Sequence, residues 1–184
     1  MLLSLDADSR AKYAGRPEAL RERFPCSGAD ASWLVGAGAS DLERFARGLL
    51  GKRWNEVRAV MALSSRVSPH LGSLYRRWLS THPASACSHS TPLSPGAREA
   101  ERALESMCSG LSGHPLSASY AGDLLRFEVL ARCSSEDHMP RTVRTSVAVH
   151  LWWASLRRGV LPFDPPLQPM LYVFEDQVRW SPAT

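Results

Sequence analysis

The sequence predicts an α+β fold, in which an N-terminal helical domain of five to six helices precedes a small C-terminal α/β lobe with an antiparallel sheet. Two observations support this prediction. Up to about residue 133, apolar residues recur at the three- and four-residue spacing of amphipathic helices. After residue 140, β-branched and aromatic residues alternate with polar ones, and two strand-like runs separated by a polar turn occur in MLYVFEDQVRW.

The composition indicates a folded globular protein. Of the 184 residues, 44% are hydrophobic and 22% are charged, which is too apolar for a disordered chain. No apolar run approaches the roughly 20 residues that a spanning helix needs, so we expect no membrane association. The first residues, MLLSLDADSR, lack the apolar core of a signal peptide. We therefore expect a cytoplasmic protein.

The cysteines indicate the redox compartment, and the charges indicate which partners to expect. The four cysteines are far apart and form no C-x-x-C pair, so we expect free thiols, mostly buried, in a reducing compartment. The formal net charge is +4, and only Lys12 and Lys52 of the 22 basic residues are lysines. Because the arginines are spread along the chain and form no basic tract, we do not expect a nucleic-acid partner.

The chain divides into three predicted segments: a weakly patterned stretch over 1–39, a helical domain over 40–134 and the lobe over 140–184. Ser40 is a suitable N-cap for a helix over 41–50 that Gly51 ends. An antiparallel helix pair follows, one helix from residue 53 and one from about residue 69. After a Ser- and Pro-rich loop over 80–96, two further helices are predicted by the apolar spacing over 97–108 and 120–131.

The lobe is predicted to contain a strand, a short helix and a hairpin. Val143, Thr145, Val147 and Val149 alternate with other residues at the period of a half-buried strand. His150 to Arg158 favour a short helix ended by Gly159. Leu171–Phe174 and Val178–Trp180 then form the hairpin strands. Three strands and one helix are marginal in isolation, so the lobe needs the helical domain or a partner.

Two polar clusters resemble sites, but each has a simpler interpretation. His82, Cys87 and His89 lie close together in the predicted loop, yet no second pair of ligands completes a zinc site, so we expect solvated loop residues and no metal site. Glu136, Asp137 and His138 mark the predicted boundary between helical domain and lobe. The sequence contains no motif of a self-sufficient catalytic site, so we expect no catalytic residues.

Part of the chain resembles a known family of partner proteins. The segment KRWNEVRAVMALSSRVSPHLGSLYRRWLSTHP (Lys52 to Pro83), the stretch DLLRFE (Asp123 to Glu128) and the tail, in which R-R-G and prolines precede the hairpin, carry the resemblance. Together they resemble the subunits that accompany multinuclear non-heme iron-dependent oxidases in the biosynthesis of ribosomally made peptide natural products. The resemblance covers residues 40 to 180 approximately.

The resemblance implies a non-catalytic subunit of a heterodimer. In such complexes the C-terminal lobe captures the leader of a precursor peptide as an added strand. The helical lobe docks on the oxidase, a separate TIM barrel that holds the iron and modifies cysteine. The methanobactin and 3-thiaglutamate pathways are the known settings. No cofactor is then expected in this chain itself.

Candidate site residues follow from the predicted elements. Either predicted strand edge is a candidate for strand addition. Three arginines near the sheet, Arg141, Arg144 and Arg179, are candidates for pairing with acidic leader residues, although each can also be a simple solubilising charge. The candidate peptide-binding residues are Val143, Thr145, Val147, Val149, Leu171, Tyr172, Val173 and Phe174, with Arg144 and Arg179. The adjacent pair Trp152 and Trp153 cannot share one face fully. Core packing is one interpretation of the pair, and the partner interface, to which we assign them with Arg76 and Arg77, is the other.

Two alternatives belong to other classes. Helices over 53–82 can form a helix-turn-helix of a DNA-binding regulator, with the hairpin as its wing. A small metalloenzyme that uses His82, Cys87 and His89 is the other alternative.

Overall fold

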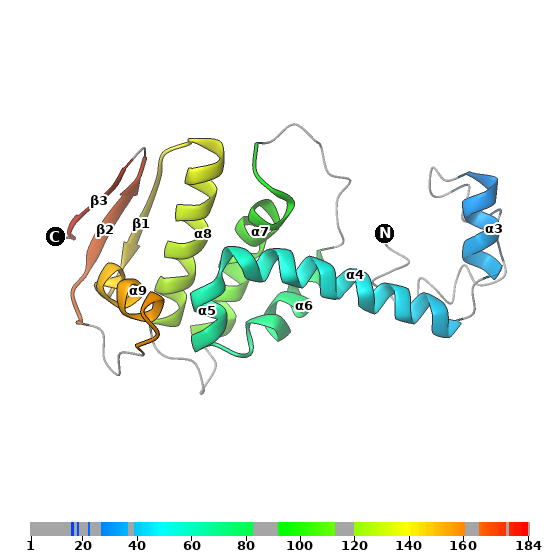
Figure 1. The fold of residues 1–184 in the computed structure, drawn as a ribbon, viewed down its shortest axis with the longest axis horizontal. Coiled ribbons are helices and arrows are strands. Elements are labelled where there is room, and N and C mark those ends of the chain that lie inside the picture. The colour runs from blue at the N-terminus through cyan, green and yellow to red at the C-terminus, as the bar shows by residue number, and fades with distance from the viewer. Residues whose placement is uncertain are drawn as a thin grey trace. The chain divides into compact units, whose positions relative to one another are not determined.

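The computed structural model describes residues 16, 18, 22, 27–36, 39–82, 92–112, 120–160, 166–175 and 177–183. The fold is α+β, as predicted: in these ranges six helices precede a three-stranded antiparallel sheet, and one helix follows its first strand (Figure 1). The elements are α3 (Gly28–Gly36), α4 (Ala39–Val60), α5 (Ala62–Val67), α6 (Leu71–Thr81), α7 (Pro95–Ser112), α8 (Ala121–Asp137), β1 (Arg141–Thr145), α9 (Val149–Arg157), β2 (Met170–Phe174) and β3 (Val178–Pro182).

The contacts within the chain define two compact units. One comprises Met1–Arg53 and Leu79–Cys87, and the other comprises Trp54–Trp78 and Ser88–Thr184. In the first unit, the rings of Trp33 and Phe45 meet edge to face, with centroids 6.3 Å apart. In the second unit, the sheet packs on α8, which also packs on α5 and α7. The boundary predicted near residues 134–140 therefore lies inside one unit.

Helix α4 differs from the prediction at Gly51, which does not end a helix. The helix continues for 22 residues through Gly51 to Val60, because the glycine is flanked by good helix formers and no proline follows it. The chain breaks instead at Met61, whose φ of −115° and ψ of 46° are not helical. The short helix α5 begins directly after this break, so the predicted pair over 53–82 consists of three helical segments.

Helix α7 begins with favourable capping chemistry. The Ser94 hydroxyl accepts a hydrogen bond from the amide of Ala97 at 3.3 Å, and Pro95 occupies the first helical position, where its missing N–H costs nothing. Gly96 then lies against the α4 backbone. A Cβ at this position would be 2.5 Å from the carbonyl oxygen of Glu56, so the close approach requires glycine.

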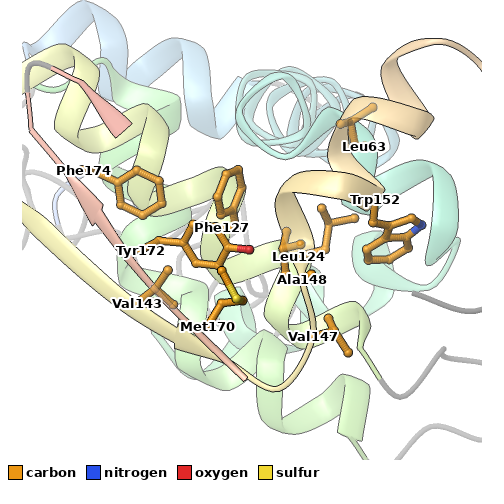
Figure 2. Close-up of a cluster of buried hydrophobic side chains, with 11 residues drawn as sticks. Leu63, Leu124, Phe127, Val143, Val147, Ala148, Trp152, Met170, Tyr172 and Phe174 are labelled. Carbon is orange, nitrogen blue, oxygen red and sulfur yellow. The ribbon is translucent and has the colours of Figure 1, made fainter. Parts of the chain in front are cut away.

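The core of the lobe lies between the sheet, α8 and α9, with α5 contributing Leu63. Figure 2 shows Phe127 extending from α8 toward two aromatic side chains of β2. The ring centroids are 5.0 Å apart for Phe127 and Tyr172 and 5.2 Å apart for Phe127 and Phe174, both near edge-to-face. The predicted need of the sheet for the helical part of the chain is met by α8.

Three carboxylates of α8 each bind a serine in another segment. Each carboxylate accepts bonds from both the amide and the hydroxyl of its serine, at 2.6 to 3.1 Å, so α8 fixes the start of α5, the start of α7 and the turn after β1. The pairs are Glu128 with Ser64, Glu136 with Ser94 and Asp123 with Ser146. Such charge-assisted bonds are stronger than neutral ones.

Two of the predicted buried thiols are confirmed. Cys108 and Cys133 are free and buried, and burial raises the pKa of each thiol to about 12. Both therefore remain protonated and unreactive at neutral pH. Cys26 and Cys87 lie outside the described residues.

Candidate peptide-binding edge of the sheet

Strand β2 lies in the centre of the sheet, between β1 and β3. All five of its residues pair with residues of β1 on one side and of β3 on the other. The prediction that Leu171–Phe174 forms a free docking edge is therefore wrong, because its backbone groups already have partners on both sides. The edge strands of this sheet are β1 and β3.

The backbone of β3 is open to a further strand. The amide of Ala183 donates to the carbonyl oxygen of Pro169 at 2.9 Å. These two residues face each other one position beyond the last β2–β3 pair, so they form a hydrogen-bonded pair of the ladder. Bonded and non-bonded pairs alternate along an antiparallel ladder. Val178 and Trp180 therefore direct their N–H and C=O groups away from β2. Pro182 occupies the next outward position, where its missing N–H limits the length of an added strand.

Strand β1 offers a shorter edge. The same alternation leaves only Thr142 and Arg144 with outward backbone groups. Both ends of the strand are held by ion pairs or hydrogen bonds: Arg141 pairs with Asp137 at 2.6 Å and Glu101 at 2.9 Å, and the amide of Ser146 donates to Asp123 at 2.7 Å. Of the two edges, β3 is the more open one.

An apolar face accompanies the β3 edge. Val178 and Trp180 lie directly opposite Phe174 and Tyr172, so they share the face of the sheet that forms the core. They are nevertheless 43% and 53% exposed. Helix α8 covers β1 and β2 on this face, and β3 lies farther from the helix (Figure 1). Part of the core face is thus left accessible beside a free strand edge.

A pocket of about 330 Å³ lies between the end of α8 and the β2–β3 hairpin. Its apolar wall is formed by Phe174 and Val178, and its helical wall ends at His138. The lining residues are Ala131, Ser134, Ser135, His138, Phe174, Glu175 and Val178. His138 adopts a left-handed conformation with φ of 56° and ends α8, so the helix stops beside the pocket.

His150 of α9 holds the position of Trp180. The two rings stack with centroids 5.0 Å apart and an interplanar angle of 21°. The Nδ1 atom of His150 is 2.8 Å from the Tyr172 hydroxyl, which also accepts the amide N–H of His150 at 3.2 Å. Burial lowers the pKa of His150 and raises that of Tyr172, so both side chains are neutral at pH 7. His150 and Tyr172 thus add no charge to the aromatic surface around Trp180.

The predicted peptide-binding residues separate onto two sides of the sheet. One set faces the core and is buried, which removes its side chains from direct peptide contact: Val143, Thr145, Tyr172 and Phe174. The other set faces solvent: Arg144, Leu171, Val173 and Arg179. Arg179 pairs with Glu175, whereas Arg144 has no ion pair in the described ranges.

Val147 and Val149 do not continue strand β1, contrary to the prediction. The hydroxyl of Thr145 donates to the carbonyl oxygen of Val147 at 2.7 Å and closes a turn at the end of the strand. Both valines are buried in the core, and Val149 begins α9. The predicted short helix after this point is confirmed, with its start one residue earlier than expected.

The two tryptophans have different environments. Trp152 is 2% exposed and packs edge to face on Tyr120, with centroids 4.2 Å apart, so its assignment to a partner interface is wrong. Trp153 is half-buried, and the Arg157 guanidinium lies 4.7 Å from its ring centroid. Arg76 and Arg77 are exposed on α6, and the Nε of Arg76 donates to Gly72 at 3.1 Å.

The two polar clusters noted in the sequence differ in how far the structure describes them. Glu136 and Asp137 belong to the last turn of α8, not to a boundary loop. Of the loop cluster, only His82 lies in the described ranges, where its Nδ1 is 2.9 Å from the Thr81 hydroxyl. Cys87 and His89 lie outside them. No group of three metal-ligating side chains occurs in the residues that the structure describes.

The accessible residues of the site, Val178, Trp180, His138 and His150, were not among the sequence-predicted ones. The alternation of Val178 and Trp180 is visible in the sequence, but their exposure depends on how far α8 covers the sheet. No protein-family model, curated protein or solved structure matches the chain. None of the described helices combines the length and the apolar character needed to cross a membrane.

Proposed function

We propose that this chain is a cytoplasmic, non-catalytic partner subunit that binds the leader of a ribosomally made precursor peptide by strand addition. It presents the peptide to a multinuclear iron oxidase, a TIM-barrel chain that holds the iron and modifies a cysteine in a 3-thiaglutamate-type or methanobactin-type pathway. The observation that carries the proposal is the free edge of β3 beside an accessible apolar face. The family resemblance of residues 40 to 180 supports the identity of the partners.

The edge defines how a leader would bind. Peptide residues opposite Val178 and Trp180 exchange backbone hydrogen bonds with β3, and their side chains point toward the pocket at the end of α8. The peptide residue opposite Arg179 lies on the other face. The preferred leader segment therefore alternates apolar residues, which fill the pocket, with acidic or polar residues that meet Arg179.

The test uses the precursor peptide encoded beside the candidate oxidase gene, with full-length chain and oxidase co-expressed. We expect a ternary complex, and slower hydrogen exchange of the Val178 and Trp180 amides when the peptide is bound. Leader peptides N-methylated at alternate positions provide the control. N-methylation of peptide residues whose backbone N–H points toward β3 should abolish binding. N-methylation of the neighbouring residues, whose N–H points away from β3, should have little effect. An oxidase that is fully active without this chain would refute the proposal.

A further inference from the structure

A second pocket, distant in sequence from the sheet edge, lies at the junction of α4 and α5. Its volume is about 440 Å³, and its lining residues are Asn55, Arg58, Ala59, Ala62, Leu63, Ser65 and Arg66. The break at Met61 turns the chain between the two helices. We call its apolar lining, Ala59, Ala62 and Leu63, the floor. Each helix also contributes one arginine, Arg58 from α4 and Arg66 from α5. This pocket belongs entirely to the second compact unit.

The charge of this pocket is unbalanced. Arg58 and Arg66 are exposed, and neither side chain forms an ion pair or hydrogen bond in the described ranges. Five other arginines there pair with carboxylates: Arg44, Arg126, Arg132, Arg141 and Arg179. The lining contains no carboxylate. The backbone and the Cβ of Glu56, the acidic residue nearest in sequence, lie against Gly96 of α7. The two guanidinium groups are therefore available to an external anion.

The remaining lining residues favour one class of anion. Ala59 and Ala62 leave the floor low enough for a side chain or backbone to approach, and buried Leu63 adds apolar surface. The amide of Asn55 supplies a further donor. Guanidinium groups bind carboxylates through two parallel hydrogen bonds, and the apolar floor suits the aliphatic part of an acidic or neighbouring apolar residue. A phosphate backbone would gain nothing from this floor.

We infer that the α4–α5 pocket is a binding site for an acidic segment of a partner protein, whose carboxylates pair with Arg58 and Arg66. This site does not depend on the proposed role of β3. It gives the chain a second binding surface, with different chemistry from the largely aromatic face beside β3.

The test measures the binding of a labelled synthetic peptide of repeating Glu-Leu-Ala units to the full-length chain by fluorescence anisotropy. A Gln-Leu-Ala peptide is the uncharged counterpart. We expect the double variant R58Q/R66Q to bind the acidic peptide about tenfold more weakly. The variant R157Q/R158Q, which loses the same charge at the end of α9 and outside both proposed sites, should bind as the unmodified chain does. In the unmodified chain, the Nε–Hε signals of Arg58 and Arg66 should shift on titration.

Three results would overturn the inference. Equal weakening in both double variants would show that net charge alone attracts the peptide. Equal binding of the Gln-Leu-Ala peptide would show that only the apolar floor matters. Tighter binding of a thymidine oligonucleotide, lost in R58Q/R66Q, would show a phosphate site instead. Because both arginines are exposed, R58Q/R66Q should unfold at the same temperature as the unmodified chain, which confirms that the fold is retained.

Discussion

Glu128 of α8 accepts both hydrogen bonds that Ser64 can donate, from its amide at 2.7 Å and from its hydroxyl at 2.6 Å. The other carboxylate oxygen accepts the amide of Leu63 at 2.9 Å. Burial raises the pKa of Glu128, and the bonds from Ser64 and Leu63 oppose this effect. A side chain more than 60 residues away in sequence thus satisfies amides at the start of α5 that the helix itself leaves unpaired.

Replacing Glu128 with alanine should therefore destabilise the protein strongly. The substitution leaves two buried amides and one buried hydroxyl without acceptors, so we expect the free energy of unfolding to fall by about 2–4 kcal/mol in a urea titration. The control is Glu105→Ala, which removes an exposed partner of Arg126 and should cost about 0.5 kcal/mol. Similar losses in the two variants would contradict the capping role of Glu128.

Acid should lower the stability of the fold by protonating Asp137. Hydrogen bonds from Arg141 lower the pKa of Asp137 to about 2, below the value of about 3.9 in an unfolded chain. A depressed carboxyl pKa stabilises the fold above the unfolded pKa, and this stabilisation is lost as the pH falls through the folded pKa. We expect Asp137→Asn to be about 1–2 kcal/mol less stable at pH 6, after allowance for solvent screening.

The difference between the two proteins should shrink below pH 4 and vanish only below about pH 2, where Asp137 is protonated in the folded protein as well. Urea titrations across this range provide the measurement. A constant difference at all pH values would show that the asparagine acts through packing and not through charge.

The adjacent tryptophans should respond very differently to truncation. Trp152→Ala removes a buried side chain from the core of the lobe, so we expect a loss of about 3–5 kcal/mol. Trp153→Ala removes a half-buried ring that packs against the core at Phe127 and contacts Arg157, so a smaller loss of about 1–2 kcal/mol is expected. Thermal or chemical denaturation of both variants checks this, and equal losses would place both rings in the core.

Substitution by alanine should change the stability of the fold in opposite directions at two glycines. At Gly96, a Cβ would lie 2.5 Å from a backbone oxygen of α4, so Gly96→Ala should cost about 1–3 kcal/mol. At Gly51, nothing lies within 4 Å and the backbone is helical, so Gly51→Ala should stabilise by about 0.5–1 kcal/mol. A destabilising Gly51→Ala would mean that the helix is not continuous at this residue.

The β3 edge can be tested without disturbing the sheet. Val178→Pro removes an N–H that faces away from β2, and Trp180→Ala removes the accessible aromatic ring; each should weaken leader binding about tenfold or more. Thr142→Pro, which removes an outward N–H from the other edge, is the matched control and should bind normally. Calorimetric titration with the leader peptide measures all three. Normal binding by Val178→Pro would exclude strand addition at β3.

Local patterns in the sequence were sufficient for the fold class, the hairpin and the short helix after β1, because these elements depend on neighbouring residues. The strand order was not predictable in the same way. Whether β2 is central depends on its pairing with β1, which comes more than 20 residues earlier in the chain. Two of the four accessible site residues, Val178 and Trp180, were therefore missed, since only the pairing shows that β3 is an open edge.

Tertiary contacts also overrode two local signals. The alternation through Val147 and Val149 continues the strand pattern, but the bond from Thr145 to the Val147 carbonyl turns the chain into the core. The doublet of Trp152 and Trp153 indicates only that the rings cannot share a face. Which ring is buried depends on Tyr120 and Leu63, which lie far away in sequence.

The serine pairs of α8 have a consequence for how the second unit opens. None of α5, α7 or the turn after β1 can separate from α8 without leaving a carboxylate and a serine amide unpaired. Partial unfolding of any one segment is therefore costly, and we expect the whole unit to behave as a single cooperative block in hydrogen exchange. A ligand that holds any part of this block protects all of it, so leader binding at β3 would lengthen the lifetime of the entire folded unit.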